Sequence, residues 1–160
     1  MIVAFFESIK YVGHLVPIAL LRIYFGYYFL VQAIEKYQGE FLLQPKLAAA
    51  ISDFLPISSA PAWYKHLVDF AVVPNWQIFA YVITYCEFVI GLSLILGFFV
   101  RPVALIGAFL ALNYVYTSSP EMAVLHELQV ALFLTLGGLG AGRCLGFDYF
   151  FFKRQRGILW

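Results

Sequence analysis

The most informative residues of this chain are ionisable side chains inside long apolar runs. Glu87 follows Trp76 by about a dozen residues within one such run. At about 1.5 Å per helical residue it would lie roughly 16 Å from that end, close to the middle of a hydrocarbon core about 30 Å thick. A carboxylate at that depth costs about 2.5 kcal/mol or more, so we expect it to face protein or water and to have a partner.

Arg22 is the candidate partner of Glu87. It lies about seven residues into the first apolar run, roughly 10 Å from the boundary where that run begins. An Arg22–Glu87 ion pair would remove the desolvation problem of both groups, and Gly26 and Gly91, one turn after each, would let the two helices approach closely. The alternative is that Arg22 extends to the lipid head groups while Glu87 is protonated and hydrogen-bonded.

Each of the four apolar runs also places hydrogen-bonding groups in the leaflet opposite to Arg22. Together they predict a cavity roofed by surface helices, although placement at the membrane interface is the simpler interpretation for any single residue. The candidate proton acceptor is His126, with Glu127 as the alternative. The candidate ligand-binding residues are Gln32, Asn113, Gln129, Trp63 and Tyr81.

Several other chemistries have no support in the sequence. It contains no HExxH motif, nucleophile elbow, phosphate-binding loop or dinucleotide-binding glycine pattern. The three histidines are too scattered to predict a metal or haem site. The two cysteines, Cys86 and Cys144, are far apart, which argues against a disulfide framework, a zinc site or a thiol relay. A net charge of +1 gives no reason to expect a nucleic-acid partner.

The composition is that of an integral membrane protein. Of 160 residues, 63% are apolar and only 12% are charged, whereas a soluble domain is nearer half apolar and a quarter charged. The predicted fold is all-α, one membrane domain over residues 1–160 built as a four-helix bundle. We expect spans at about residues 13–36, 76–100, 102–118 and 123–140, so the lipid bilayer is an expected partner.

The segments outside the spans have their own predicted places. The long loop at residues 37–75 is expected to contain two short amphipathic helices that lie on the membrane as a cap, and residues 1–11 are expected to lie on the opposite surface. Residues 141–160 are expected to form a tail. Most basic residues outside the long loop fall on the side of the termini, so both termini should be cytoplasmic and the long loop external. These residues are Lys10, Arg101, Arg143, Lys153, Arg154 and Arg156.

Three stretches of the chain resemble the DoxX family of small four-helix membrane proteins. They are residues 20–37, 87–114 and 140–151, which extend from the first predicted span to the predicted tail on either side of the long loop. Their order and spacing, more than any single motif, carry the resemblance. The matching positions are Arg22, Gly26 and Lys36 in the first stretch, Glu87, Gly91, Gly97 and Arg101 in the second, and Gly142, Arg143 and Asp148 in the third.

Within that family, residues 58–81 look most like the DoxD-type membrane subunit of thiosulfate:quinone oxidoreductase. This resemblance implies a prokaryotic plasma-membrane protein that passes electrons from sulfur compounds to quinone. The family also includes members linked to protein trafficking or folding. The paired cysteines of quinone-using thiol oxidoreductases are missing, which argues against an autonomous thiol enzyme.

The leading hypothesis is therefore a membrane subunit of a quinone-linked oxidoreductase that houses or borders a quinone site. Glu87, Arg22 and His126 would be its catalytic residues, quinone its cofactor, and other membrane or redox subunits its partners, with no metal or haem of its own. The alternative is a non-catalytic accessory or assembly subunit of a larger respiratory or photosynthetic complex. A carrier or folding factor is the third hypothesis.

Overall fold

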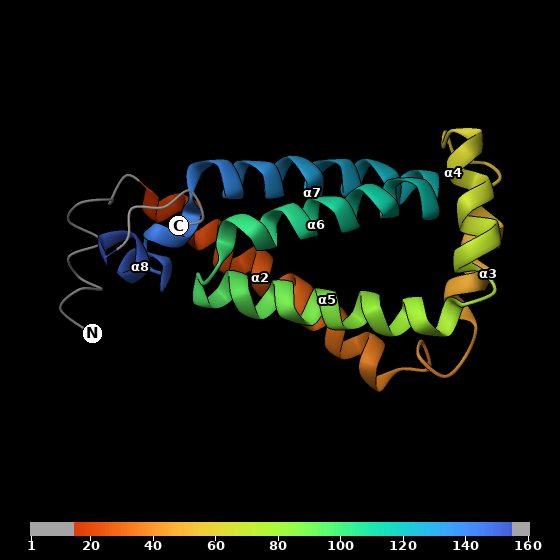
Figure 1. The fold of residues 1–160 in the computed structure, drawn as a ribbon, viewed down its shortest axis with the longest axis horizontal. Coiled ribbons are helices and arrows are strands. Elements are labelled where there is room, and N and C mark those ends of the chain that lie inside the picture. Colours follow the sequence, from red (N-terminus) through yellow and green to blue (C-terminus); the bar gives the residue numbers. More distant parts are fainter. Residues whose placement is uncertain (1–14, 155–160) are drawn as a thin grey trace.

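A computed structural model of the protein describes residues 15–154, which form helices and turns with no strand. Four long helices run alongside one another: α2 (Val16–Gln38), α5 (Trp76–Leu96), α6 (Val100–Thr117) and α7 (Pro120–Leu139) (Figure 1). Each is long and apolar enough to cross a membrane. The predicted all-α membrane bundle is confirmed. The surface segment expected at residues 1–11 and the start of the first span at residue 13 lie outside the described residues.

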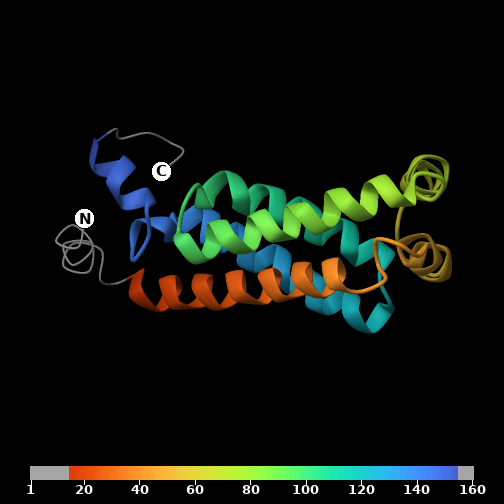
Figure 2. The same ribbon diagram turned by 90° about the horizontal axis from the view of Figure 1, so that it is seen from below.

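Short helices cover the two ends of the bundle. At one end, here called the cap end, α3 (Lys46–Phe54) and α4 (Ala62–Leu67), which continues as the π-turn η2 (Val68–Val72), cross the bundle nearly at right angles (Figures 1 and 2). At the other end, the base end, the turn η3 (Ala141–Arg143) leads into α8 (Asp148–Arg154). The predicted long loop with short helices is therefore present.

Glycine and proline set several of the helix boundaries. Gly97 and Gly140 end α5 and α7 with φ values of 66° and 62°, a left-handed conformation that favours glycine. Because of Gly97, α5 ends four residues before the boundary expected at residue 100. The next helix then begins at Val100, and Pro102 is tolerated because it lies in the first turn of α6.

The four long helices pack as two tight pairs, α2 with α5 and α6 with α7. In the first pair the backbones touch: a Cβ atom added at Gly91 would lie 2.7 Å from the Leu30 nitrogen. In the second pair the ring of Phe133 lies directly on Gly107. The ring of Phe25 joins the pairs, with its centroid 4.8 Å from that of Phe133. Close approach at small residues is the usual basis of helix association in membranes.

The outward faces of the helices are apolar. Large side chains such as Tyr24, Leu105 and Phe109 are mostly exposed in the isolated chain. In a membrane-spanning bundle, faces of this kind are covered by lipid, because the bilayer supplies the apolar environment that they need. The described residues therefore have the character of a multi-pass membrane protein.

Candidate functional site

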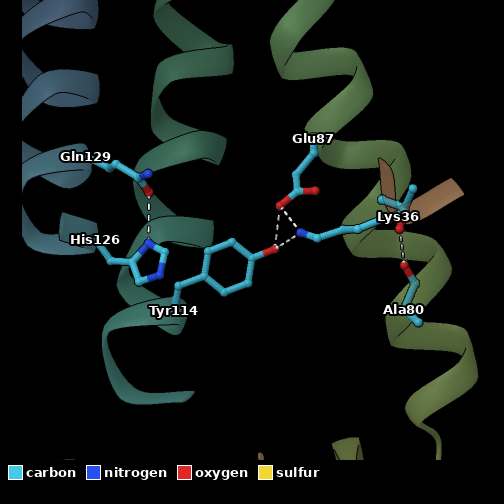
Figure 3. Close-up of polar contacts among 7 residues, drawn as sticks. Lys36, Ala80, Glu87, Tyr114, His126 and Gln129 are labelled. Atoms are coloured by element: carbon cyan, nitrogen blue, oxygen red, sulfur yellow. Dashed lines mark hydrogen bonds and ion pairs between the residues drawn. The ribbon is translucent and has the colours of Figure 1, made fainter. Parts of the chain in front are cut away.

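A buried ion pair lies between α2 and α5 near the cap end. The Lys36 ammonium lies 2.5 Å from Glu87 Oε1 and donates to the Tyr114 hydroxyl at 3.1 Å (Figure 3). The same hydroxyl donates to Glu87 Oε1 at 2.6 Å. Glu87 is only 2% exposed, and Lys36 is 20% exposed. The partner of the membrane carboxylate is therefore a lysine from the end of the first span, supported by a phenol from α6.

The directions of the helices explain this pairing. Side chains in an α-helix lean toward its N-terminus. The two helices are antiparallel, so Lys36 in the last turn of α2 leans back into the bundle while Glu87 on α5 leans toward the cap end, and the two converge. Two aromatic rings make cation–π contacts with the Lys36 ammonium. The ring centroids of Phe41 and Tyr114 lie 5.6 Å and 5.2 Å from Lys36 Nζ.

The predicted Arg22–Glu87 ion pair is wrong. Arg22 is fully buried at the base end, where its guanidinium donates to three backbone carbonyl oxygens of the segment after α7. These acceptors are Ala141 at 2.8 Å, Cys144 at 3.3 Å and Leu145 at 2.9 Å. By the same rule of direction, Arg22 leans toward the base and Glu87 toward the cap, so the two side chains diverge.

Asp148 completes the buried network at the base end. Its carboxylate accepts hydrogen bonds from the backbone N–H groups of Phe99 at 2.8 Å and Val100 at 3.0 Å, and so caps the start of α6 from outside that helix. Burial raises the pKa of the Asp148 carboxyl above its ordinary value, although these two hydrogen bonds act in the opposite direction. The base end therefore combines a buried cation and a buried anion that both bind backbone groups.

A cavity of about 310 Å³, here called the polar chamber, adjoins the Lys36–Glu87 pair. All four long helices and α3 contribute to its wall. One oxygen of Glu87, Oε2, is buried and has no hydrogen-bond partner among the described residues. Such an atom is costly to bury, because it has lost its contacts with water without gaining a partner. The polar lining residues include Gln32, Lys36, Glu87, Tyr114, His126 and Gln129.

His126 and Gln129 form a second polar pair on the α7 side of the chamber. His126 Nδ1 lies 3.0 Å from Gln129 Oε1, and the imidazole centroid lies 5.2 Å from that of Tyr114 (Figure 3). The two residues are three positions apart on α7, so both side chains lie on the same face of that helix. The structure thus places Gln32, Glu87, His126 and Gln129 around one cavity.

The other predicted ligand-binding residues lie outside this chamber. Trp63 is 68% exposed on α4, and Tyr81 stacks on Tyr85 without lining the chamber. Asn113 accepts a hydrogen bond from the Tyr64 hydroxyl at 2.8 Å, which ties α4 to α6. The alternative proton acceptor, Glu127, is exposed. Whether a residue lines the chamber depends on the face of the helix on which it lies. Its depth in the membrane, which was the basis of the prediction, does not reveal that face.

Lys36 and Tyr114 belong to the site although the sequence did not single them out for it. Lys36 follows Gln32 by four residues, so the two share one face of α2, and this spacing is the signal that could have found it. No comparable spacing indicates Tyr114. The polar residue that the sequence did single out next to it, Asn113, lines a different cavity.

Comparison with known protein families identifies the chain. Residues 18–120, well over half of the sequence, match the DoxX family. The chain belongs to the DoxX family. Searches of curated proteins and of solved structures returned no match. The matched range includes Lys36, Glu87 and Tyr114, whereas His126 and Gln129 lie beyond it.

The chamber of this DoxX protein has a definite chemical capability. An ammonium group carries three donors, and Lys36 uses two of them on Glu87 and Tyr114. The remaining donor of Lys36 and the polar atoms of His126 and Gln129 offer both donors and acceptors to a bound molecule. Because Lys36 and Glu87 neutralise one another, the chamber is suited to an uncharged, hydrogen-bonding group.

Proposed function

We propose that this DoxX protein is the membrane subunit of a quinone-linked oxidoreductase, similar to the DoxD-type subunit of thiosulfate:quinone oxidoreductase, and that the polar chamber binds the quinone head group. The observation that carries the proposal is the Lys36–Glu87 ion pair beside a cavity within a membrane-spanning bundle, a cavity that His126 and Gln129 also line. A volume of about 310 Å³ is within the range of small-molecule sites.

The residues of the chamber have separate roles in this proposal. Quinone carbonyl oxygens accept hydrogen bonds, and Lys36 is the donor that we assign to them. His126 Nδ1 donates to Gln129 Oε1, so its Nε2 is left as an acceptor for a quinol hydroxyl. Reduction of a quinone to a quinol takes up two electrons and two protons, and oxidation returns them. We assign the electrons to a redox partner subunit, whereas Glu87 and His126 would hold or release the protons. Arg22 has no part in this chemistry and serves the stability of the base end.

Equilibrium binding in lipid nanodiscs tests the proposal. A quinone with a short tail should bind the wild-type protein, and the Glu87→Gln substitution should weaken that binding about tenfold, or roughly 1.4 kcal/mol. Glu35→Gln is the matched control, because Glu35 is an exposed carboxylate near the same end of α2. Equal affinity in the wild type and in Glu87→Gln, or no binding to the wild type, would overturn the proposal.

Purification from native membranes in a mild detergent tests the proposed partner. We expect a redox subunit to accompany the protein together with bound quinone, and the quinone to be lost from a Glu87→Gln preparation while the partner remains. A stable complex with larger subunits that never contains quinone in this chain would instead favour an accessory or assembly subunit.

We also propose that the protein lies in a prokaryotic plasma membrane with the base end toward the cytoplasm. Arg101, Arg143 and Arg154 lie at the base end, whereas the short loop at residues 117–121 of the cap end has no basic residue. This is the asymmetry expected from the positive-inside rule. Labelling of single cysteines introduced at Glu121 and Arg154 by a membrane-impermeant reagent in intact cells should modify only the first.

A further inference from the structure

A second cavity lies between α5 and α6 and shares part of its wall with the polar chamber. Its volume is about 320 Å³, and α4 and η2 roof it at the cap end. The lining is almost wholly apolar, with Phe79 and Ile83 from α5 and Phe109 and Leu110 from α6. We call it the apolar furrow.

The furrow continues toward the base end. A smaller cavity of about 190 Å³ shares Cys86 and Ile106 with it and reaches Ile90 and Val103. From Phe79 to Ile90 the lining follows α5 for eleven residues, or about 16 Å at 1.5 Å per residue. The furrow is therefore long and narrow, and it follows the direction of lipid chains in the bilayer.

Tyr114 separates the furrow from the chamber. Leu47, Tyr114 and Thr117 line both cavities. The Tyr114 hydroxyl is held by Lys36 and Glu87 on the chamber side. A molecule that filled both cavities would thus place a polar part beside the ion pair and an apolar part between α5 and α6, with the Tyr114 ring at the junction.

We propose that the apolar furrow binds the hydrophobic tail of the same molecule whose head group occupies the polar chamber. This inference rests on the proposed function. The head group must be uncharged, because Lys36 and Glu87 compensate one another, and this argues against the phosphate or ammonium group of a phospholipid. An uncharged head that reaches a site within the bilayer must come from a lipid-soluble molecule, and the furrow offers its tail an apolar surface.

Two matched substitutions on α6 test the tail site. Ile106 is 50% exposed and lines the furrow, whereas Leu112 is 47% exposed and lines neither cavity. Because both are half exposed, a larger side chain fits at either position without entering the packed core. Ile106→Trp should fill the furrow where it meets its continuation, and Leu112→Trp should leave it open. Val82→Trp, which fills the furrow from α5, provides a second variant in case the first does not fold.

The measurement compares a quinone that carries an isoprenoid tail with one that lacks it, both at known concentration in the nanodisc lipid. The tailed quinone should bind the wild type about tenfold more tightly. Ile106→Trp and Val82→Trp should abolish that advantage and leave the affinity for the tail-less quinone unchanged. Leu112→Trp should behave as the wild type.

The possible results separate the two proposals. If both quinones bind and the furrow variants do not change their ratio, the tail site is wrong and the head-group site stands. If an ordinary phospholipid displaces the tailed quinone, the furrow is a general lipid site and the inference fails. If neither quinone binds to the wild type, the proposed function itself fails and the tail site fails with it.

Discussion

The two ends of the bundle each bury a cation, and they satisfy it in different ways. At the base end, Arg22 donates to three backbone carbonyl groups within a packed turn. At the cap end, Lys36 donates to two side chains, Glu87 and Tyr114, beside a cavity. One arrangement uses acceptors that are fixed by the backbone, whereas the other uses side-chain acceptors. Each leaves one buried polar atom, Arg22 Nε or Glu87 Oε2, without a partner among the described residues.

This difference in partners is what leads us to propose a structural role for one buried charge and a ligand-binding role for the other. Backbone carbonyl groups do not titrate and are fixed by the turn, so the partners of Arg22 favour a structural role for it. A carboxylate and a phenol can exchange protons and accept a different partner, which makes the Lys36–Glu87–Tyr114 cluster suited to a ligand. A buried charge in a membrane span is a functional hypothesis by default, and the chemistry of its partners decides which kind it is.

The largest effect should come from Arg22→Met. Three buried carbonyl groups lose their donor at a cost of about 1–3 kcal/mol each, so we expect the free energy of unfolding to fall by roughly 5 kcal/mol. Unfolding by sodium dodecyl sulfate in mixed micelles, followed by circular dichroism, measures it. If the stability were unchanged and quinone binding were lost, Arg22 would belong with the functional charges.

Lys36→Met should have the next largest effect. It leaves the buried Glu87 carboxylate without its cation, and we expect a loss of about 3 kcal/mol in the same unfolding measurement. The double variant Lys36→Met/Glu87→Gln removes both charges and should recover at least half of that loss. Lys46→Met is the control, since its ion pair with Glu40 is on the surface and should contribute less than about 1 kcal/mol. Additive effects of the two chamber substitutions would contradict the coupling.

Gly91→Ala tests the close backbone contact between α2 and α5, the two helices that connect the base end to the cap end. The added methyl group would meet the backbone of α2 at Leu30, so we expect a destabilisation of about 2 kcal/mol in the unfolding assay. Gly138→Ala is the matched control, because nothing lies within 4 Å of its Cβ position. It should be neutral or slightly stabilising. Equal effects at the two glycines would show that the α2–α5 backbones are not in close contact.

Asp148→Ala should have the smallest effect, about 1 kcal/mol, because the N–H groups of Phe99 and Val100 lose their acceptor. The effect should depend on pH. The pKa of Asp148 is raised by burial above 3.8, so the folded protein binds more protons than the unfolded chain between pH 3.8 and the raised pKa. The stability of the wild type relative to the variant should therefore fall as the pH rises through this window and stay constant above it. The opposite slope in unfolding measured across this range would show that the carboxylate is stabilised by its surroundings.

Much of the fold could be predicted from the sequence because apolar runs and their breaks determine membrane spans. The long loop with two short helices followed from the length of its apolar segments, and the close approach of Gly26 and Gly91 followed from their spacing beside the charges. The exact end of α5 did not, because the left-handed turn at Gly97 and Phe99 depends on the contact with Asp148 from the far end of the chain.

The candidate site could be predicted only in part. Depth along a span drew attention to Glu87, His126 and Gln129, which all line one cavity, and their roles there stay a prediction. It failed for the partner of Glu87, because equal depth does not take account of the direction in which a side chain leans. Lys36 is the last residue of the predicted first span, at the membrane boundary. Its long side chain nevertheless reaches back into the bundle and brings the ammonium group to the Glu87 carboxylate.

The packing of the bundle as two helix pairs has a consequence for the site. Gln32, Lys36 and Glu87 belong to the α2–α5 pair, whereas Tyr114, His126 and Gln129 belong to α6 and α7. A ligand in the chamber would therefore touch both pairs, and a small shear between them would change its contacts. Since bilayer thickness and lateral pressure act on the tilt of each pair, we expect the affinity of the chamber to vary with the acyl-chain length of the surrounding lipid.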